Sequence, residues 1–340
     1  MPSSSPRRAT LATVAASAGV SIATVSKVLN GRSDVAPATR TLVESLLRQH
    51  DYVAPAPRRD ATRRGTIEVQ VDKDLNAYST EIIQGAVTAG EEVDVAVVVS
   101  VRRHSDRPTA WARDLAAAGR LALIAVTSEL TVGHLTALSR AGLSLVMIDP
   151  LNQPRTRVIS IGSTNFAGGL AATQHLLSLG HRRIAFIGGH ATAACHQARM
   201  HGYRAAMEAA GAHVLPGYIQ TGHFHYDDGV AGSSALLDLS RPPTAVFAGN
   251  DETALGVIEG ARTRGLRVPA DLSIVGFDDT QIAAMASPPL TTVRQPLRQM
   301  GGVALRSALR LAAGERTDSH HVELATELVV RASTAPVRAG

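Results

Sequence analysis

The amino-acid sequence predicts an α/β protein in which a small all-helical N-terminal module precedes two similar lobes, each built on a parallel sheet. Two observations predict this class. Residues 10–30 contain two short helical periodicities separated by a glycine, which is typical of two helices joined by a tight turn. From Gly65 onward, short apolar runs alternate with helical patterns, and the alternation begins again in the second half of the chain. Such alternation indicates parallel strands covered by helices on both faces of a sheet.

The N-terminal module begins with a predicted helix-turn-helix. Thr10 is a suitable cap for the first helix, and Gly19 fits the left-handed backbone at its end. Ser21 is a suitable cap for the second helix. A third helix follows, because Pro37 fits a first helical position and apolar residues recur after it.

The second predicted helix presents a polar and small-residue face that suits a DNA groove. In a helix-turn-helix, the start of this helix reads base edges in the major groove. We expect Ile22 and Ala23 to contact thymine methyl groups and Lys27 to donate to guanine. The residues expected at phosphates are Thr10, Ser21, Thr24, Ser26 and Asn30. Periodicity alone leaves open an ordinary helical hairpin with a solvated polar face.

The distribution of charge favours the DNA-binding interpretation. Residues 1–64 contain ten Lys or Arg side chains and four Asp or Glu, which gives a net charge of +6. The whole chain carries +5, so residues 65–340 sum to −1. A basic N-terminal module on a nearly neutral body is the electrostatic pattern of a protein that binds nucleic acid.

The motif itself resembles a known family. Residues Thr10–Tyr52 include the pattern V-A-x-x-A-G-V-S-x-x-T-V-S from Val14 and the later pair Thr39-Arg40. They resemble the headpiece of the lactose and galactose repressor (LacI/GalR) family, and the resemblance continues through nearly all of the chain. It implies a DNA-binding headpiece over residues 1–52 and a two-lobe effector-binding and dimerisation domain over residues 66–335.

Residues 53–65 form a basic linker rich in Pro and Arg. Its prolines disfavour helix, so a flexible tether is the simpler interpretation for the free protein. In the resembled family this segment folds on operator DNA as a hinge helix, and a Leu wedges into the minor groove. Here Asp60 or Ala61 stands about where that wedge would be. Arg58 and Arg59 are still expected to contact phosphates.

The predicted elements of the body fall into two sets. The strands are expected at Thr66–Val71, Val93–Ser100, Leu121–Val126, Leu143–Ile148, Arg183–Gly188, Thr244–Ala248 and Ser273–Phe277. The helices are expected at Ser79–Ala89, Thr109–Ala118, Phe166–Leu179, Gln197–Ala210, Asp228–Asp238, Asp251–Arg264 and Pro296–Ala313.

The lobes are expected to be joined by three crossings, at Asp149–Gly162, at Leu290–Gln295 and near His320. The resemblance implies the same organisation, with two Rossmann-like lobes of the periplasmic-binding-protein type. Lobe 1 would comprise about residues 66–160 and 295–320, and lobe 2 about residues 163–290 and 321–335.

Composition limits the cellular setting. Cys195 is the only cysteine, which excludes an intramolecular disulfide and fits a reducing cytoplasm. No apolar run is long enough to span a membrane. Arg7-Arg8 before an Ala- and Val-rich stretch superficially resembles an export signal, which would make the chain an exported sugar-binding protein. Polar residues interrupt that stretch at helical spacing, so the helix-turn-helix interpretation is preferred.

Motifs for catalysis and for cofactors are missing from the sequence. There is no G-x-G-x-x-G after a strand, no Walker A motif, no G-x-S-x-G and no H-E-x-x-H. The pairs His223-x-His225 and His320-His321 raise the question of a metal, but scattered surface histidines are far commoner than metal sites. We therefore expect no cofactor, no metal and no enzymatic activity.

Polar residues follow several predicted strands, where ligands of open α/β lobes bind. Asp149, Asn250 and Asp278 lie at such positions, and Arg199 opens a helix after Gly188-Gly189. Carboxylate, amide and guanidinium groups together suit the hydroxyl groups of a sugar. Taken singly, Asn250 or Asp251 fits a helix cap, Asp278 or Asp279 fits a turn, and Arg199 fits a structural ion pair.

The resemblance favours the functional interpretation of these residues. The segments beginning at Arg199, Asn250 and Gly276 correspond to effector-contact segments of the family. The resemblance implies Asp149, Arg199, Asn250 and Asp278 as polar ligand contacts and places Phe224 against the ligand face. Further candidates are Ser163, Tyr78 and Cys195.

The expected function is that of a cytoplasmic, sequence-specific DNA-binding repressor of sugar-uptake or sugar-catabolic genes. It would bind a pseudo-palindromic operator as a homodimer, with part of the dimer interface on the predicted helix Ser79–Ala89. A small-molecule effector, expected to be a sugar, would bind between the lobes and change operator affinity. The alternatives are a sugar-binding protein without a DNA role and, third, an enzyme with its active site between the lobes.

Overall fold

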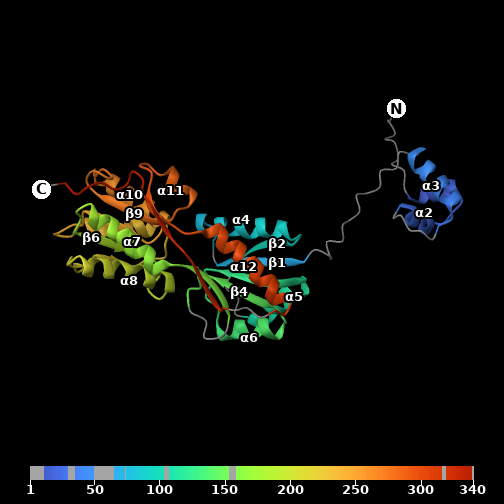
Figure 1. Cartoon of the computed structure of the whole chain (residues 1–340), viewed down its shortest axis with the longest axis horizontal. Helices are drawn as coiled ribbons and strands as arrows, with labels where there is room; N and C mark the ends of the chain where they lie inside the picture. Colours follow the sequence, from blue (N-terminus) through green and yellow to red (C-terminus); the bar gives the residue numbers. More distant parts are fainter. Residues whose placement is uncertain are drawn as a thin grey trace, which may run out of the picture. The chain divides into compact units, whose positions relative to one another are not determined.

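The computed structural model describes residues 11–29, 35–49, 65–72, 74–102, 107–152, 158–315 and 319–338. The chain divides into two compact units, residues 1–63 and residues 64–340. Figure 1 labels the elements of both. The α/β class with an all-helical N-terminal module is confirmed.

The first unit contains α1 (Leu11–Ala18), α2 (Ile22–Leu29) and α3 (Pro37–Gln49). The helices pack around a small apolar core whose buried members are Val14, Ala15, Val25, Val28 and Val43. Gly19 adopts a φ of +63°, the left-handed conformation that the turn between α1 and α2 requires. The Oγ of Ser21 accepts from the N–H of Thr24 at 3.1 Å, so Ser21 caps α2 as predicted.

The second unit holds two six-stranded sheets, each with helices on both faces. In the first sheet the strand order is β11-β5-β4-β3-β1-β2, and all pairs are parallel. Its strands are β1 (Thr66–Asp72), β2 (Ala96–Arg102), β3 (Arg120–Val126), β4 (Ser144–Ile148), β5 (Ile159–Ser163) and β11 (His321–Leu324). Helices α4 (Ala77–Glu92) and α12 (Leu297–Ala312) pack on one face, and α5 (Pro108–Ala117) and α6 (Val132–Arg140) on the other.

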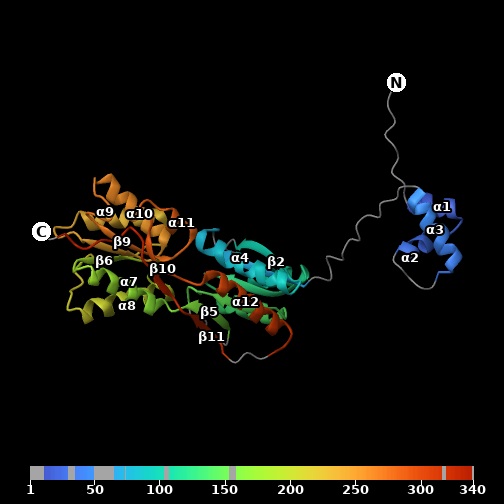
Figure 2. The same ribbon diagram turned by 45° about the horizontal axis from the view of Figure 1, so that its top comes forward.

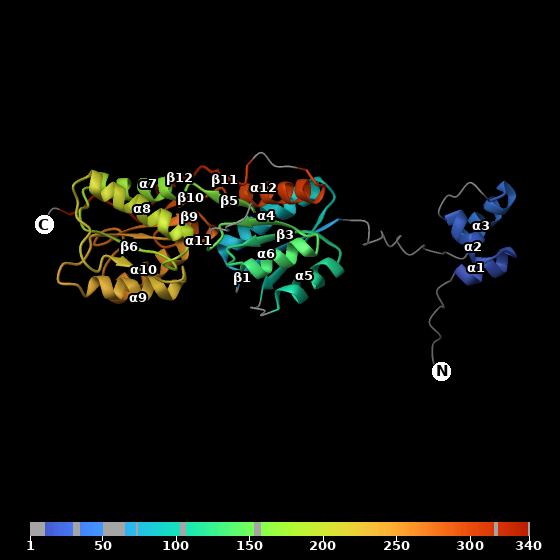
Figure 3. The ribbon, with the colours of Figure 1, turned by 90° about the horizontal axis from the view of Figure 1, so that it is seen from below.

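The second sheet has the order β12-β10-β9-β8-β6-β7 and is parallel except for β12. Its strands are β6 (Ile184–Ile187), β7 (Ile219–Gln220), β8 (Ala245–Ala248), β9 (Ser273–Asp278), β10 (Thr291–Arg294) and β12 (Glu327–Val329). Figure 3 shows α7 (Asn165–Ser178) and α8 (Ala194–Ala209) on one face, with α9 (Tyr226–Leu237) and α10 (Asp251–Thr263) on the other. The short helix α11 (Gln281–Met285) follows β9.

Three crossings join the lobes, which lie end to end in Figure 2. The chain passes from β5 to α7 at Thr164, from β10 to α12 at Gln295-Pro296, and from β11 to β12 near Thr326. The Oγ1 atoms of Thr164 and Thr326 lie 2.9 Å apart, so the first and third crossings are hydrogen-bonded to each other.

Three expectations about the crossings were wrong. Residues 291–294 form β10 of the second sheet, so of the expected crossing Leu290–Gln295 only Gln295 lies between the lobes. Residues 159–163 form β5 of the first sheet, so the first crossing begins after Ser163 and not within Asp149–Gly162. Residues 321–324 form β11, which pairs with β5, so they belong to the first lobe and not to the second. Strands β5 and β11 are short and contain Gly, Ser, His or Glu, so neither has an apolar run that predicts a strand.

Helices α7 and α8 cross with their backbones in close contact. A Cβ on Gly202 of α8 would overlap the carbonyl oxygen of Phe166, and one on Gly169 of α7 would overlap that of Arg199. Only glycine therefore permits this approach. The close crossing brings Asn165 at the start of α7 beside Arg199 of α8.

Candidate functional site

The exposed face of α2 carries the predicted base-reading side chains. Ile22 is 53% exposed although it is a large apolar residue, and Ala23 and Lys27 are also exposed. Thr24 and Ser26 are partly buried on the same helix. The apolar face of α2 is buried through Val25 and Val28, so the residues left outward are those the sequence predicted. Thr10, Asn30, Arg58 and Arg59 lie outside the described residues.

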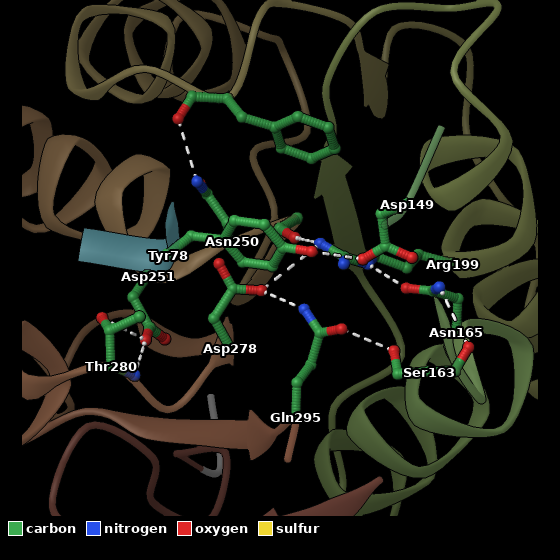
Figure 4. Close-up of polar contacts among 12 residues, drawn as sticks. Tyr78, Asp149, Ser163, Asn165, Arg199, Asn250, Asp251, Asp278, Thr280 and Gln295 are labelled. Carbon is green, nitrogen blue, oxygen red and sulfur yellow. Dashed lines mark hydrogen bonds and ion pairs between the residues drawn. The ribbon is translucent and has the colours of Figure 1, made fainter. Parts of the chain in front are cut away.

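In the second unit, Arg199 is the centre of a buried polar cluster (Figure 4). Its side chain is buried, and the Nε donates to Asn165 Oδ1 at 2.8 Å. Its Nη1 donates to the carbonyl oxygen of Gly249 at 2.5 Å and lies 3.7 Å from Asp278 Oδ1. The guanidinium carbon also lies 3.9 Å from the centroid of the Phe277 ring. These contacts hold the cation in one orientation, with its charge next to a carboxylate.

A chain of hydrogen bonds runs from Asp278 to the first lobe. Gln295 Nε2 donates to Asp278 Oδ1 at 2.6 Å, and Ser163 Oγ donates to Gln295 Oε1 at 2.5 Å. Asp278 ends β9 in the second sheet, Ser163 ends β5 in the first, and Gln295 lies on the crossing between them. All three side chains are buried. The chain therefore couples the carboxyl ends of both sheets through one amide.

Asp149 and Tyr78 form a second group, contributed by the first lobe. Tyr78 Oη donates to Asp149 Oδ2 at 2.5 Å. Burial raises the pKa of Asp149 and raises that of Tyr78 well above its ordinary value. Burial likewise raises the pKa of Asp278 well above its ordinary range, against the lowering effect of Arg199. Ionisation of these buried carboxyl groups is therefore unfavourable unless polar partners compensate the charge.

Asn250 serves the fold as well as the cluster. Its Oδ1 accepts from the N–H of Thr253 at 2.9 Å, which caps α10, and its Nδ2 donates to the carbonyl oxygen of Phe224 at 2.9 Å. The helix-cap interpretation is therefore correct for Asn250, and the same side chain fixes the loop that carries Phe224. The ring of Phe224 lies 5.6 Å from the guanidinium carbon of Arg199.

Asp251 points away from this cluster. Its Oδ2 accepts from the N–H and hydroxyl of Thr280 at 2.8 and 3.0 Å, and its Oδ1 accepts from Thr292 Oγ1 at 2.5 Å. Burial raises its pKa to about 7 despite these donors. Asp279 also has structural partners, Arg294 and Arg331, at 2.7 and 2.5 Å. Both residues stabilise the base of the site.

Three of the predicted ligand-contact residues have strained backbone. Asp149, Phe224 and Asp278 have φ values of +41°, +67° and +111°. Non-glycine residues rarely adopt this region, and they persist there where surrounding contacts hold them. The strain therefore coincides with the side chains that the sequence predicted as ligand contacts.

The cluster is suited to an uncharged polyhydroxylated ligand. Arg199 is the one permanent cation among the described residues of the cluster, and Asp278 accompanies it. Carboxyl, amide, hydroxyl and guanidinium groups offer both donors and acceptors, as vicinal hydroxyl groups require. Within the described part of the chain, no three His, Cys, Asp or Glu side chains are arranged to hold a metal ion.

Cys195 lies at the start of α8 beside the cluster, where it lines a cavity of about 380 Å³ together with Asp149, Ser163 and Asn165. Burial raises the pKa of its thiol to about 11. The thiol is therefore a neutral, weakly polar part of the wall.

Sequence reasoning missed Gln295 and Asn165. Each lies at or near the end of a strand, β10 and β5 respectively, that the sequence pattern did not predict. The rule that ligands bind beyond the carboxyl ends of strands would have selected both, had those strands been recognised.

Among the described residues, no helix is long and apolar enough to cross a membrane.

Comparison with known proteins identifies both units. Residues 10–54 match the family described as bacterial regulatory proteins, lacI family, and residues 173–334 match a periplasmic binding protein-like domain. Catabolite control protein A of Priestia megaterium is 32% identical over 332 residues, which cover 96% of this chain and 99% of that protein.

Solved structures agree with this assignment over the length of the chain. The transcriptional regulator CelR in complex with cellobiose has a TM-score of 0.73 at 33% identity, covering 96% of this chain and 100% of that one. The lac repressor dimer bound to operator and the anti-inducer ONPF has a TM-score of 0.75 at 27% identity, covering 97% and 100%. The chain therefore belongs to the lacI family of bacterial regulatory proteins and is a DNA-binding transcriptional regulator, not an enzyme.

Proposed function

We propose that the protein is a cytoplasmic repressor that binds a pseudo-palindromic operator as a homodimer and responds to a sugar bound between its lobes. The observation that carries the proposal is the hydrogen-bond chain from Ser163 through Gln295 to Asp278. Because it joins the ends of both sheets, a ligand that replaces part of it acts on both lobes at once. Residues 1–52 would read the operator, and residues 53–65 would connect this headpiece to the two-lobe body.

On the DNA side, the exposed face of α2 supports major-groove binding. We assign Ile22, Ala23 and Lys27 to base edges, since they lie outward on a helix whose other face is buried. Ser21, Thr24 and Ser26 are assigned to phosphates, as are Thr10, Asn30, Arg58 and Arg59 on the grounds of their residue types. The excess positive charge of residues 1–64 supports strong dependence of affinity on salt.

On the ligand side, the cluster supports a sugar. CelR, at 33% identity, was solved with cellobiose. In this chain Asp149, Arg199, Asn250 and Asp278 would bind hydroxyl groups, and Phe224 would pack against the apolar face of a ring. Tyr78 and Ser163 would add hydroxyl contacts, and Cys195 would contribute to the wall. A sugar effector implies that the regulated genes serve sugar uptake or sugar catabolism.

The dimer is supported by exposed apolar side chains on β2 and α11. Val99 and Val101 on the edge strand β2 are 39% and 40% exposed, and Met285 at the end of α11 is 77% exposed. Figures 1 and 2 show β2, α4 and α11 on the same side of the two lobes. An exposed apolar edge strand is a usual place for association. The related lac repressor structure is a dimer bound to operator.

Selection of DNA from a random library tests this function and identifies the operator in the same experiment. Full-length protein is used to enrich duplexes from the library, and the same selection is made with residues 65–340 alone. We expect the full chain to enrich a sequence with two-fold symmetry and the truncated chain to enrich none. Enrichment of one sequence by both proteins would refute the headpiece assignment, and enrichment of none by the full chain would refute the DNA-binding role.

A further inference from the structure

The cavity beside Cys195 extends the site beyond the polar cluster. Its volume is about 380 Å³, within the range of roughly 300–1,000 Å³ that small-molecule sites occupy. Phe224, Asn250 and Asp278 are not among its described lining residues. Asp149 and Ser163 belong to both the cavity and the cluster. Both residues line the cavity, and in the cluster Asp149 is hydrogen-bonded to Tyr78 and Ser163 to Gln295. The open space thus begins where the cluster ends.

The far wall of the cavity is a polar face of β11. Residues of a strand alternate between its faces, and Val322 and Leu324 pack against the core of the first lobe. His321 and Glu323 therefore face the cavity, which they line. His321 Nδ1 lies 2.9 Å from Ser160 Oγ, and its Nε2 lies 3.4 Å from Glu323 Oε1. Imidazole, hydroxyl and carboxylate groups together offer donors and acceptors to further hydroxyl groups.

The charge of the cavity disfavours an anion. Carboxyl groups line it on two sides, Asp149 from the end of β4 and Glu323 from β11. The cation of the cluster, Arg199, is occupied by Asn165, Gly249 and Asp278. A phosphate or a carboxylate placed in the cavity would meet like charges without a free permanent cation among the described lining residues.

We propose that this cavity is a second subsite of the effector site and that the effector is an uncharged saccharide of two rings. One ring binds at Asp278 and Asn250, Asp149 and Ser163 lie at the junction, and the second ring binds against His321 and Glu323. The inference rests on the proposed sugar-binding function. Asp278 and Asn250, which would bind the first ring, are not among the described residues that line the cavity, so the cavity offers space for a second ring.

Matched sugars and a cavity-filling variant test the subsite in the full-length protein. Binding is measured by isothermal titration calorimetry for the pairs glucose and cellobiose, glucose and maltose, and galactose and lactose, with glucose 6-phosphate as the anionic probe. Ala198→Leu fills the cavity from α8. Ala205→Leu makes the same change at a partly buried position two turns along the same helix and outside the described lining residues, so it is the matched control.

At least one disaccharide should bind more tightly than its monosaccharide. Overpacking in Ala198→Leu should weaken that disaccharide by about tenfold or more and the monosaccharide by less than about threefold. His321→Ala should weaken the disaccharide by roughly three- to tenfold, the value of one hydrogen bond. Ala205→Leu should leave both unchanged, and glucose 6-phosphate should bind no more tightly than glucose.

Equal effects of Ala198→Leu on both sugars, or tighter binding of glucose 6-phosphate than of glucose, would overturn the subsite while a sugar effector stands. Tighter binding of every monosaccharide than of its disaccharide would also overturn the subsite while a sugar effector stands. If no sugar of either size binds, the proposed effector class fails as well, so the two failures are distinguishable.

Discussion

Arg199 shows how one residue serves both stability and recognition. Its guanidinium group is buried and bonded to Asn165 and Gly249, with Asp278 as its counter-charge. A buried charge is tolerated only with such partners, because removal of one leaves the other uncompensated. The fold itself therefore holds the guanidinium group in one orientation, and a rigid binding group lowers the ordering cost of binding.

A double-mutant cycle tests this role. Arg199→Met should lower the free energy of unfolding by about 3–5 kcal/mol, since Asp278 then lies buried without its cation. Asp278→Asn alone should cost less, because Asn tolerates a positive φ and keeps an oxygen for Gln295. The double variant should be more stable than the sum of the single effects predicts, by about 1 kcal/mol or more. Additive losses in urea unfolding would show that the pair is not coupled.

Asp251 predicts a pH dependence of stability. Its pKa in the folded protein is raised to about 7 from an ordinary value of 3.8, so between these values the folded state binds more protons than the unfolded state. Its contribution to the free energy of unfolding therefore falls as pH rises from about 4 to about 7, by at most about 4 kcal/mol. Urea unfolding of the wild type and of Asp251→Asn should show this fall in the difference between them.

The control for Asp251 is a carboxyl group on the surface. Asp227 is exposed in the first turn of α9, and Asp227→Asn should leave the pH dependence of the wild type intact. If the stability difference between the wild type and Asp251→Asn is constant from pH 4 to pH 7, burial does not raise the pKa of Asp251 in the way described.

At the scale of elements, close helix crossings fix the geometry of each lobe. In the first lobe α4 and α12 approach through Gly85 and Gly301, whose added Cβ atoms would overlap the carbonyl oxygens of Arg298 and Ile82. The crossing of α7 and α8 in the second lobe uses glycine in the same way. These crossings position the first residues of α4 and α7, among them Tyr78 and Asn165, at the site.

Substitution by Ala at two adjacent glycines of α12 should therefore change the stability of the protein in opposite directions. Gly301→Ala should destabilise the protein by about 1–3 kcal/mol, because the overlap is with backbone. At Gly302 a Cβ would lie 3.4 Å from its nearest neighbour, the flexible end of the Arg306 side chain. Gly302→Ala should thus stabilise the helix by roughly 0.5–1 kcal/mol. Thermal unfolding of both variants is the measurement, and equal shifts would contradict the packing described.

The sequence predicted the long elements because their patterns are strong. The three helices of the headpiece and the apolar strands β1, β3, β4, β6, β8 and β9 were identified within a few residues of their ends. The short strands β5, β7, β10, β11 and β12 were not, since their stability comes from neighbours in the sheet and not from an apolar run of their own. The lobe boundaries and Gln295 were missed for the same reason.

The residue types of the candidate site were predictable, but their partners were not. Asp149, Arg199 and Asp278 follow from the positions of strand ends and from the family resemblance. That Asp251 faces Thr280 and Thr292 while Asp278 faces Arg199 depends on how α10 packs beside β9 and β10 and on the positive φ of Asp278. A linear pattern contains neither piece of information.

At the scale of the whole molecule, the chain joins a DNA-reading headpiece to a body proposed to sense a ligand. Net charge is divided accordingly, with +6 on residues 1–64 and −1 on the remainder. If a sugar changes the affinity for operator by some factor, operator must change the affinity for that sugar by the same factor. This reciprocity holds whether the sugar acts as inducer or as co-repressor.

Coupling between sugar and DNA is tested most directly by measuring operator affinity with and without a saturating sugar. A fluorescent duplex carrying the selected operator is titrated with full-length protein, and the sugar is one shown by calorimetry to bind. We expect a change in operator affinity of roughly 5–150-fold, an equal change in sugar affinity when operator is present, and loss of both in Asp278→Asn. Identical operator affinity with the sugar bound and unbound would contradict the proposed coupling.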